Sequence, residues 1–248
     1  MKNKKRLDVF VHELFPKYSR RQIQSWIMQG KVTVDDKVVT KSGTQVADDV
    51  KIVMNVQEPK YVGRAGFKIE KALDHFKIDV TDMIVLDAGL STGGFADCLL
   101  QRGAKKIYGV DVGYGQVHEK IRNDDRVVVI ERTNLRHTEN VLQHLAEKTV
   151  DLVTLDLSFI SILKVMDTVD TVLKKGGQLV TLIKPQFEAE RHEVGKGGIV
   201  KDEKVHKKVI DKVTAGIKEL GFNLVGITES PIEGASGNKE FLAYFKKA

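Results

Sequence analysis

The N-terminal part of the chain shows helical spacing of its apolar residues. Residues 7–14 carry apolar side chains at i, i+3, i+4 and i+7, which predicts one helix, and Pro16 ends it. Ser19 and Gln22 have the spacing of a capping box, which predicts the start of a second helix. Gly30 supplies its stop. The chain therefore opens on two short amphipathic helices.

Short apolar runs follow the two helices. Residues 32–34 and 37–39 flank Asp35-Asp36 and predict a hairpin, and residues 50–54 predict a further strand. Pro59 then interrupts regular structure. The sequence predicts a small α+β domain over residues 1–58, followed by a linker over residues 59–65.

From residue 66 onward, apolar runs alternate with helical patterns. Helical faces occur between residues 162 and 173 and between residues 205 and 220. Strands are predicted at 84–87, 107–111, 127–130, 152–156, 179–183, 222–228 and 240–246. Repeated β–α units with apolar strands indicate a mostly parallel sheet with helices on both faces. Residues 66–248 are thus predicted to form an α/β, Rossmann-like domain.

Charge is concentrated in the first domain. Residues 1–58 contain eleven Lys/Arg and seven Asp/Glu, so they hold +4 of the total charge of +6. A basic face attracts a polyanion because phosphates release condensed counterions on binding, although a merely solvated surface has the same composition. Arg20 and Arg21 stand in the first turn of a helix, where the dipole disfavours cations and favours a bound anion. The candidate contacts to the phosphates of a polyanion are Arg6, Arg20, Arg21, Lys31, Lys37 and Lys41.

Several classes of protein are disfavoured by composition. No stretch reaches the roughly 18–20 apolar residues that cross a bilayer, and the basic start lacks the apolar core of a signal peptide. Cys98 is the only cysteine, so neither an internal disulfide nor a cysteine zinc site is expected. The histidines lack metal-ligand spacing, so no metal is expected. A cytoplasmic protein without membrane contact is the simplest interpretation.

A glycine-rich turn joins the first large-domain strand to its helix, over residues 87–95. Its glycine spacing differs from the dinucleotide fingerprint. An acidic residue before the turn repels a pyrophosphate but suits a cationic sulfonium, which favours S-adenosylmethionine over NAD or ATP. Asp111 ends the next strand, where a carboxylate can accept hydrogen bonds from ribose hydroxyls; the alternative is a solvated strand end. The candidate cofactor residues are Asp87, Gly89, Ser91, Thr92, Gly93, Gly94, Phe95 and Asp111.

Polar residues also end two later strands. Asp156 and Lys184 each follow an apolar run. Ligands of open α/β sheets bind outside the carboxyl ends of the strands, so both side chains should lie near the glycine-rich turn. A lysine at the end of an apolar strand is costly unless it is paired, and Asp156 is the obvious partner for Lys184.

Two resemblances extend this interpretation. Residues 5–55, with Arg6-Leu7-Asp8, Ser19-Arg20-Arg21 and Gly30-Lys31-Val32, resemble the RNA-binding domain named after ribosomal protein S4. The whole chain resembles the TlyA or hemolysin A family, in which an S4-like domain precedes an FtsJ-like, class I methyltransferase domain. The motifs that carry this resemblance are residues 87–95, 111–116 and 184–188.

The family resemblance implies a reaction and its residues. It implies methyl transfer from S-adenosylmethionine to a ribose 2′-hydroxyl, that of a cytidine, in ribosomal RNA or ribosomal subunits. It places the family's Lys–Asp–Lys–Glu tetrad on Lys68, Asp156, Lys184 and Glu240. A lysine accepts the hydroxyl proton only in its neutral form; otherwise it steers the hydroxyl and stabilises developing charge.

The chain departs from the family at three points. Gly63 and Arg64-Ala65-Gly66 differ from the usual residues before the tetrad lysine. Asn134, a further candidate cofactor residue, stands where an Asp is more common. These departures leave the tetrad intact and bear on adenine contacts and substrate preference.

Three other functions remain to be weighed. A non-catalytic ribosome-binding or assembly factor would keep the fold, but all four tetrad residues are present. A membrane-active hemolysin needs a spanning or inserting segment. Methyltransferases of bases or proteins often carry an Asn/Asp-Pro-Pro-Tyr segment after the fourth strand, where this chain has Asp156-Leu157-Ser158-Phe159.

Overall fold

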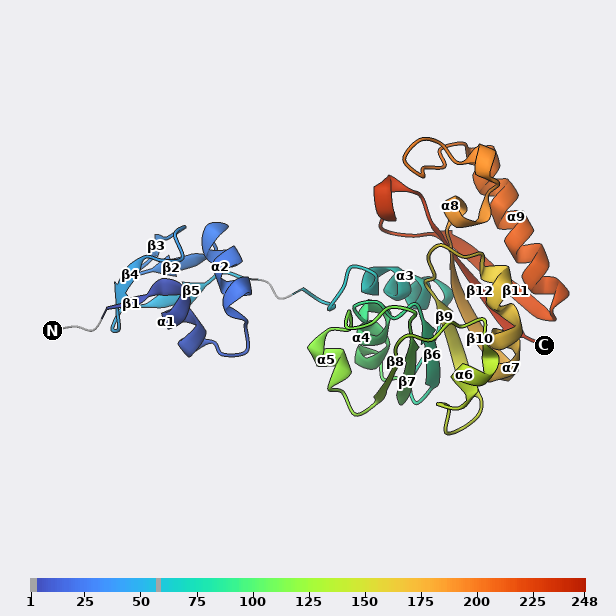
Figure 1. Cartoon of the computed structure of the whole chain (residues 1–248), viewed down its shortest axis with the longest axis horizontal. Coiled ribbons are helices and arrows are strands. Elements are labelled where there is room, and N and C mark those ends of the chain that lie inside the picture. The colour runs from blue at the N-terminus through green and yellow to red at the C-terminus, as the bar shows by residue number, and fades with distance from the viewer. Residues whose placement is uncertain (1–3, 57–58) are drawn as a thin grey trace. The chain divides into compact units, whose positions relative to one another are not determined.

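Figure 1 shows the computed structural model of the chain, which describes residues 4–56 and 59–248. The chain divides into two compact units between Lys60 and Tyr61. Residues 61–65, which the sequence places in the linker, belong to the second unit. Tyr61 is buried there, and the Val62 N–H donates to the Asp97 carboxylate at 2.8 Å.

The small unit combines two helices with short strands. Its elements are β1 (Lys4–Arg6), α1 (Leu7–Leu14), α2 (Arg20–Met28), β2 (Val32–Val34), β3 (Lys37–Val38), β4 (Gln45–Ala47) and β5 (Ile52–Met54). The predicted capping box is confirmed, because the Ser19 hydroxyl accepts from the Gln22 N–H and the Gln22 side chain accepts from the Ser19 N–H. The predicted hairpin pairs β2 with β3, and Asp35 and Asp36 both have positive φ, as a type I′ turn requires.

The second unit is built on one sheet with the strand order β11-β12-β10-β9-β6-β7-β8. The strands are β6 (Ile84–Ala88), β7 (Lys106–Val110), β8 (Val127–Ile130), β9 (Val150–Leu155), β10 (Leu173–Ile183), β11 (Phe222–Glu229) and β12 (Phe241–Lys247). β12 runs antiparallel to both of its neighbours, whereas β10, β9, β6, β7 and β8 are mutually parallel.

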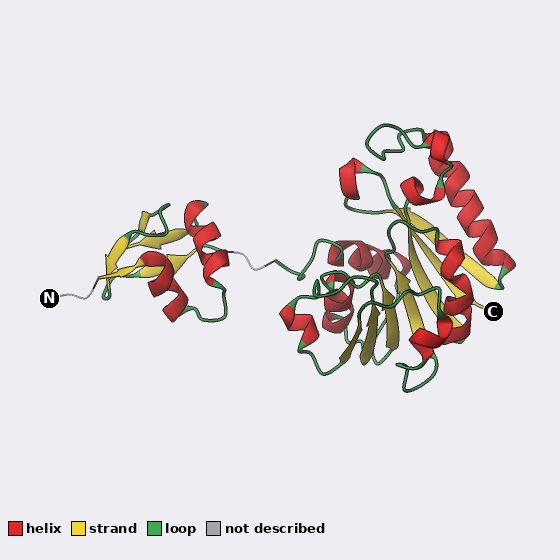
Figure 2. Cartoon of the chain, in the orientation of Figure 1, coloured by secondary structure: helices red, strands yellow, loops and turns green. Residues whose placement is uncertain are grey.

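Helices alternate with these strands along the chain (Figure 2). They are α3 (Gly66–Phe76), α4 (Gly94–Gln101), α5 (Glu119–Arg122), α6 (Thr138–Leu142), α7 (Met166–Val172), α8 (Pro185–Glu188) and α9 (Glu203–Glu219). Short 3₁₀ turns occupy Ile162–Val165, Arg191–Glu193 and Ala235–Gly237.

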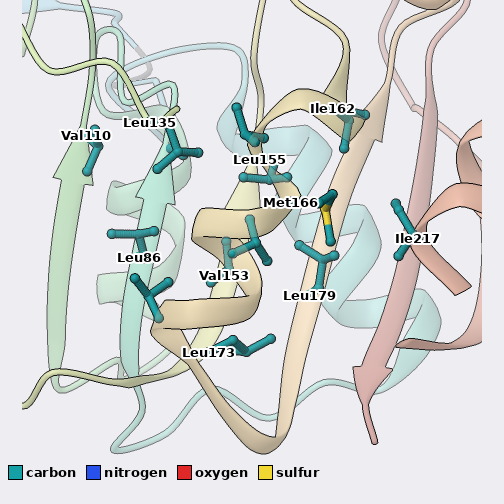
Figure 3. Packing of buried hydrophobic residues seen from close by; sticks show 14 of the residues in the cluster. Leu86, Val110, Leu135, Val153, Leu155, Ile162, Met166, Leu173, Leu179 and Ile217 are labelled. Atoms are coloured by element: carbon teal, nitrogen blue, oxygen red, sulfur yellow. The ribbon is translucent and has the colours of Figure 1, made fainter. Parts of the chain in front are cut away.

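The core of this unit lies on both faces of the sheet. On one face Leu86 and Leu155 pack with α6, α7 and α9 (Figure 3), whereas on the other Val85 and Leu152 pack with α3, α4 and α5. Neighbouring residues of a strand thus enter different clusters, because strand side chains alternate between faces. This arrangement confirms the predicted α/β sheet covered by helices on both faces.

One element begins earlier than its pattern indicates. Leu173, which continues the apolar face predicted for a helix, is instead the first residue of β10 and pairs with Val150 of β9. Helix α7 ends at Val172, and the strand register shifts between Leu173 and Gln178. A buried leucine satisfies either pattern, so helical spacing alone does not place this boundary.

Candidate active site

The strand order reverses next to β6. The chain runs from β6 through β7 to β8 towards one edge, and then crosses to β9 on the other side of β6. The loops after β6 and β9 therefore diverge, and such a crevice at the carboxyl ends of parallel strands is where open α/β sheets bind ligands. Gly89, Asp111, Asp156 and Lys184 directly follow the last residues of β6, β7, β9 and β10.

The four predicted catalytic side chains meet in this crevice. Lys184 Nζ lies 2.6 Å from Asp156 Oδ1, and Lys68 Nζ lies 2.6 Å from Glu240 Oε2 and 3.9 Å from Asp156 Oδ2. All four side chains are at most 12 % exposed. The resulting chain of contacts, Glu240–Lys68–Asp156–Lys184, balances two positive charges with two negative charges away from bulk solvent.

Backbone geometry brings these residues together from distant parts of the sequence. Lys68 comes from α3 and Glu240 immediately precedes β12, a separation of 172 residues. Gly89 has φ 89°, and a Cβ there would overlap the Asp156 carbonyl oxygen. A Cβ at Gly234 would overlap the Glu240 carboxylate. These two glycines let the strand ends and the loop before β12 approach closely enough to assemble the tetrad.

Two adjoining cavities open at the tetrad. The smaller, about 510 Å³, is lined by all four tetrad residues and by Arg64, among others. The larger, about 720 Å³, is lined by Asp111, Val112, Asn134 and Leu135. Both volumes fall in the range of small-molecule sites. The cavities share Gly89, Ser91, Asp156, Ser158, Phe159 and Phe187.

The larger cavity has the hydrogen-bond acceptors expected for the ribose of a nucleoside. The two oxygens of Asp111 each accept one backbone N–H at 2.7 Å, from Ser91 and from Gly113. A carboxylate oxygen has a second lone pair, so the fixed Asp111 side chain can still accept from ribose hydroxyls. Asn134 Oδ1 accepts from the Arg136 N–H, which orients its amide at the cavity wall.

The predicted cofactor residues do not all line a cavity. Gly89, Ser91, Asp111 and Asn134 line the larger cavity, whereas Thr92, Gly94 and Phe95 line only the smaller one. Gly93 has φ 93°, and a Cβ there would collide with the Ile121 side chain rather than enter a cavity. Asp87 is fully buried, and its Oδ1 accepts from the Thr154 hydroxyl at 2.8 Å. Gly93 and Asp87 therefore pack against the protein interior and support the conformation of the turn without lining a cavity.

The environment of Asp87 predicts a pH-dependent stability. Burial raises the pKa of Asp87 to about 7, and the nearby Asp156 charge adds to this, while the Thr154 hydrogen bond opposes it. The folded state then keeps a proton that the unfolded state loses from about pH 4 upward. This group's contribution to stability should fall as pH rises to about 7 and then level off.

Asp87→Asn tests this expectation, because the amide cannot ionise. We compare the unfolding free energy of the native protein with that of the variant. The native value minus the variant value should fall by on the order of 3 kcal/mol between pH 4 and pH 8. Denaturant unfolding of both ligand-free proteins across that range measures the difference. Parallel stability curves would show that Asp87 titrates normally.

In the small unit, the structure separates the predicted RNA contacts into two groups. Arg6 and Arg20 donate to the carboxylate of Asp8 at 3.0 and 3.1 Å, and Gln24 donates at 2.6 Å. The Arg6 hydrogen bond is the largest influence that holds the pKa of the fully buried Asp8 well below its usual range. Arg21, Lys31, Lys37 and Lys41 are exposed, as are Arg6 and Arg20, so contact with Asp8 rather than exposure distinguishes the two groups.

The structure adds several residues to the site that the sequence analysis did not select as candidates. Phe159 is 91 % exposed with φ 64°, and its ring centroid lies 5.0 Å from that of Phe187. Ser158 accepts from Lys184 at 3.1 Å. Glu188 is buried and accepts from the Ser161 hydroxyl and the Ile162 N–H, both at 2.7 Å. Their place just after the ends of β9 and β10 was the available signal.

Comparison with known proteins identifies the family of both units. Residues 61–247 match the FtsJ-like methyltransferase family, and residues 5–52 match the S4 domain. Hemolysin A of Brachyspira hyodysenteriae is 43% identical over 97% of this chain and 99% of its own length. The 16S/23S rRNA (cytidine-2′-O)-methyltransferase TlyA of Mycobacterium tuberculosis is 40% identical over 92% of this chain and 84% of its own.

A solved structure shows the same organisation. A protein provisionally named a hemolysin, from Streptococcus thermophilus, superposes with a TM-score of 0.74 at 39% identity, covering 100% of this chain and 90% of that one. In the part of this chain that the structure describes, no helix combines the length and apolar character needed to cross a bilayer. The chain belongs to the TlyA or hemolysin A family, in which an S4 domain precedes an FtsJ-like methyltransferase domain.

Proposed function

We propose that this methyltransferase transfers the methyl group of S-adenosylmethionine to the ribose 2′-hydroxyl of a cytidine in ribosomal RNA. The observation that carries the proposal is the buried Lys–Asp–Lys–Glu cluster on the wall of the smaller cavity, with Asp156 also lining the larger one. The name of the mycobacterial relative supports the nucleotide and the RNA.

The larger cavity suits the cofactor. Asp111 would hold the ribose hydroxyls, Val112 and Leu135 would pack on the adenine, and Asn134 would contact its edge. S-adenosylmethionine supplies an activated methyl group on a cationic sulfur, and the Asp156 carboxylate on the wall common to both cavities favours that charge. The methyl group would then face the tetrad.

The smaller cavity suits the target nucleotide. Lys184 and Lys68 stand on its wall, where they can orient a 2′-hydroxyl and stabilise negative charge that develops on its oxygen. The Phe159 and Phe187 rings, which line this cavity as well as the larger one, offer a stacking surface for an unstacked base. Alignment of the hydroxyl with the methyl group contributes much of the rate of such reactions.

The small unit would bring the RNA to this site. The small unit matches the S4 domain, and this resemblance implies RNA binding. The exposed cations Arg21, Lys31, Lys37 and Lys41 suit phosphate contacts. Arg6 and Arg20 divide their charge between Asp8 and any phosphate, so we assign them a smaller share of the binding.

Asp111→Ala should weaken cofactor binding. Two ribose hydroxyls would lose their acceptor, and the Ser91 and Gly113 N–H groups that hold the turn would lose theirs. We expect S-adenosylhomocysteine affinity to fall by about tenfold to a hundredfold, or about 1–3 kcal/mol. Calorimetric titration measures this loss, and Asp211→Ala, at an exposed position of α9 outside both cavities, is the control. Unchanged affinity would remove Asp111 from the site.

The proposed function is tested by mapping 2′-O-methylation. Ribosomal RNA from cells with and without the gene should differ at one or more cytidines, and the purified protein should restore those methyl groups to subunits from cells that lack it. Identical methylation maps, together with no transfer in vitro, would reject the proposal.

A further inference from the structure

The two lysines of the tetrad have different partners. Lys68 Nζ lies beside two carboxylates, Glu240 at 2.6 Å and Asp156 at 3.9 Å. Lys184 Nζ contacts one carboxylate, Asp156 at 2.6 Å, and donates to the neutral hydroxyl of Ser158 at 3.1 Å. Only Lys184 therefore combines a charged partner with a hydroxyl among these contacts.

Ser158 stands at the place where the chemistry is proposed to occur. It follows Asp156 by two residues in the loop after β9, and it lines both cavities. Ser158 is exposed, whereas the Lys184 side chain is 8 % exposed. The hydroxyl thus contacts the buried amine from the side on which cofactor and target would meet.

The loop that carries Ser158 is held at both ends. The Asp156 N–H donates to the Ala88 carbonyl at 3.0 Å, so the start of this loop is hydrogen-bonded to the end of the neighbouring strand β6. Glu188 of α8 accepts from the Ser161 hydroxyl and the Ile162 N–H, each at 2.7 Å, and α8 immediately follows Lys184. The far end of the Ser158 loop is therefore bonded to α8, and Lys184 lies at the start of the same short helix.

We infer that Ser158 is a positioning residue that orients the Lys184 amine towards the target hydroxyl. The inference rests on the proposed function. The Lys184 ammonium must first release one proton to water, and the resulting neutral amine has two hydrogens and one lone pair at tetrahedral positions. Ser158 accepts one hydrogen of the amine at 3.1 Å, whereas Asp156 attracts the amine at 2.6 Å without hydrogen-bond geometry. The Ser158 hydroxyl is therefore the directional contact that leaves the lone pair for the ribose hydroxyl. As the 2′-oxygen bonds to the methyl carbon and the carbon–sulfur bond breaks, the hydroxyl proton passes to that lone pair.

The variants Ser158→Ala, Ser158→Cys and Ser158→Thr separate the hydroxyl from the size of the side chain. We expect Ala and Cys to slow single-turnover methyl transfer to subunits about tenfold, the effect of one lost hydrogen bond. Thr should stay within about threefold of the native rate, because it keeps the hydroxyl. Affinities for S-adenosylhomocysteine and for subunits should change less than about twofold in all three.

Three results would overturn the inference: native rates in Ala and Cys, equal slowing in all three variants, or a rate loss matched by a loss of cofactor affinity. The native protein in the same assay tests the proposed function separately. If the native protein transfers no methyl group to subunits, the proposed function fails.

A second measurement tests the position of the amine without turnover. Acylation of individual lysines, followed by peptide mass spectrometry, should label Lys184 at least about threefold faster in Ala and Cys than in native protein or Thr. Lys68, whose partners in the described structure are Glu240 and Asp156 rather than Ser158, is the internal reference. Equal labelling of Lys184 in all four proteins would overturn the inference whether or not the protein is a methyltransferase.

Discussion

Lys184→Ala should abolish methyl transfer while leaving cofactor affinity almost unchanged. Lys184 lines only the smaller, tetrad cavity, whereas the nucleoside residues line the larger one. Removing the amine takes away the group that contacts the hydroxyl and leaves Asp156 with Lys68 at 3.9 Å. Losses from removing a positioned acid or base are about 10²–10⁴ in rate. Single-turnover transfer to ribosomal subunits measures the loss, and titration with S-adenosylhomocysteine checks the cofactor site.

Lys184→Arg separates two roles for the lysine. Arginine keeps the positive charge beside Asp156 but cannot accept a proton at neutral pH. An arginine variant as slow as the alanine variant indicates proton transfer, whereas partial activity indicates that charge alone contributes. Lys204→Ala, at an exposed position of α9, is the control for lysine loss. Near-native transfer by Lys184→Ala would contradict the proposed chemistry, even if the protein proved to be a methyltransferase.

The supporting residues of the tetrad should rank below Lys184. Asp156 contacts both lysines and lines both cavities, so Asp156→Ala should reduce transfer and, more mildly, cofactor binding. Lys68 and Glu240 pair with each other at 2.6 Å, so Lys68→Ala leaves the buried Glu240 carboxylate without its lysine, whereas Glu240→Ala leaves Lys68 with Asp156 alone, at 3.9 Å. Thermal unfolding must therefore accompany the rates, because part of any loss in these two variants can be lost folding.

The positions of the site were largely predictable because parallel strands place their carboxyl ends together. Asp111, Asp156 and Lys184 each follow a strand directly, and the apolar runs mark where those strands end. Lys68 and Glu240 lie 172 residues apart, and no local pattern connects them. Their pairing came from the family resemblance alone.

Other features depended on tertiary contacts that carry no sequence period. Asp8 reads as an ordinary acidic residue of the first helix turn, yet it is fully buried between Arg6, Arg20 and Gln24. Tyr61 follows Pro59 closely and was predicted to be linker, yet a Cβ at Gly66 would collide with its buried ring. Single long-range contacts of this kind determine whether a residue is buried at positions where the hydrophobic pattern predicts nothing.

Reversing three exposed cations of the small unit should remove most RNA binding. Arg21→Glu, Lys31→Glu and Lys41→Glu together change the local charge by six units without touching the buried Asp8 cluster. Arg20 is left intact, because a glutamate there would stand beside the Asp8 carboxylate that Arg20 now contacts at 3.1 Å and would destabilise the fold. Each lost phosphate contact lowers the salt slope of binding by about 0.7–0.9, so the triple variant should lose about two units of slope.

The affinity of the protein for ribosomal subunits or ribosomal RNA is measured at several salt concentrations. Its affinity for the cofactor shows whether the second unit is intact. We expect an affinity loss of about 10²-fold or more at low salt, and unchanged binding of S-adenosylhomocysteine. The matched control is Lys204→Glu, Lys207→Glu and Lys218→Glu on α9, which carries the same charge change on exposed positions of the second unit. If both triple variants lose affinity equally, net charge rather than the small unit drives binding. If neither does, the S4 domain of this protein has a role other than RNA capture.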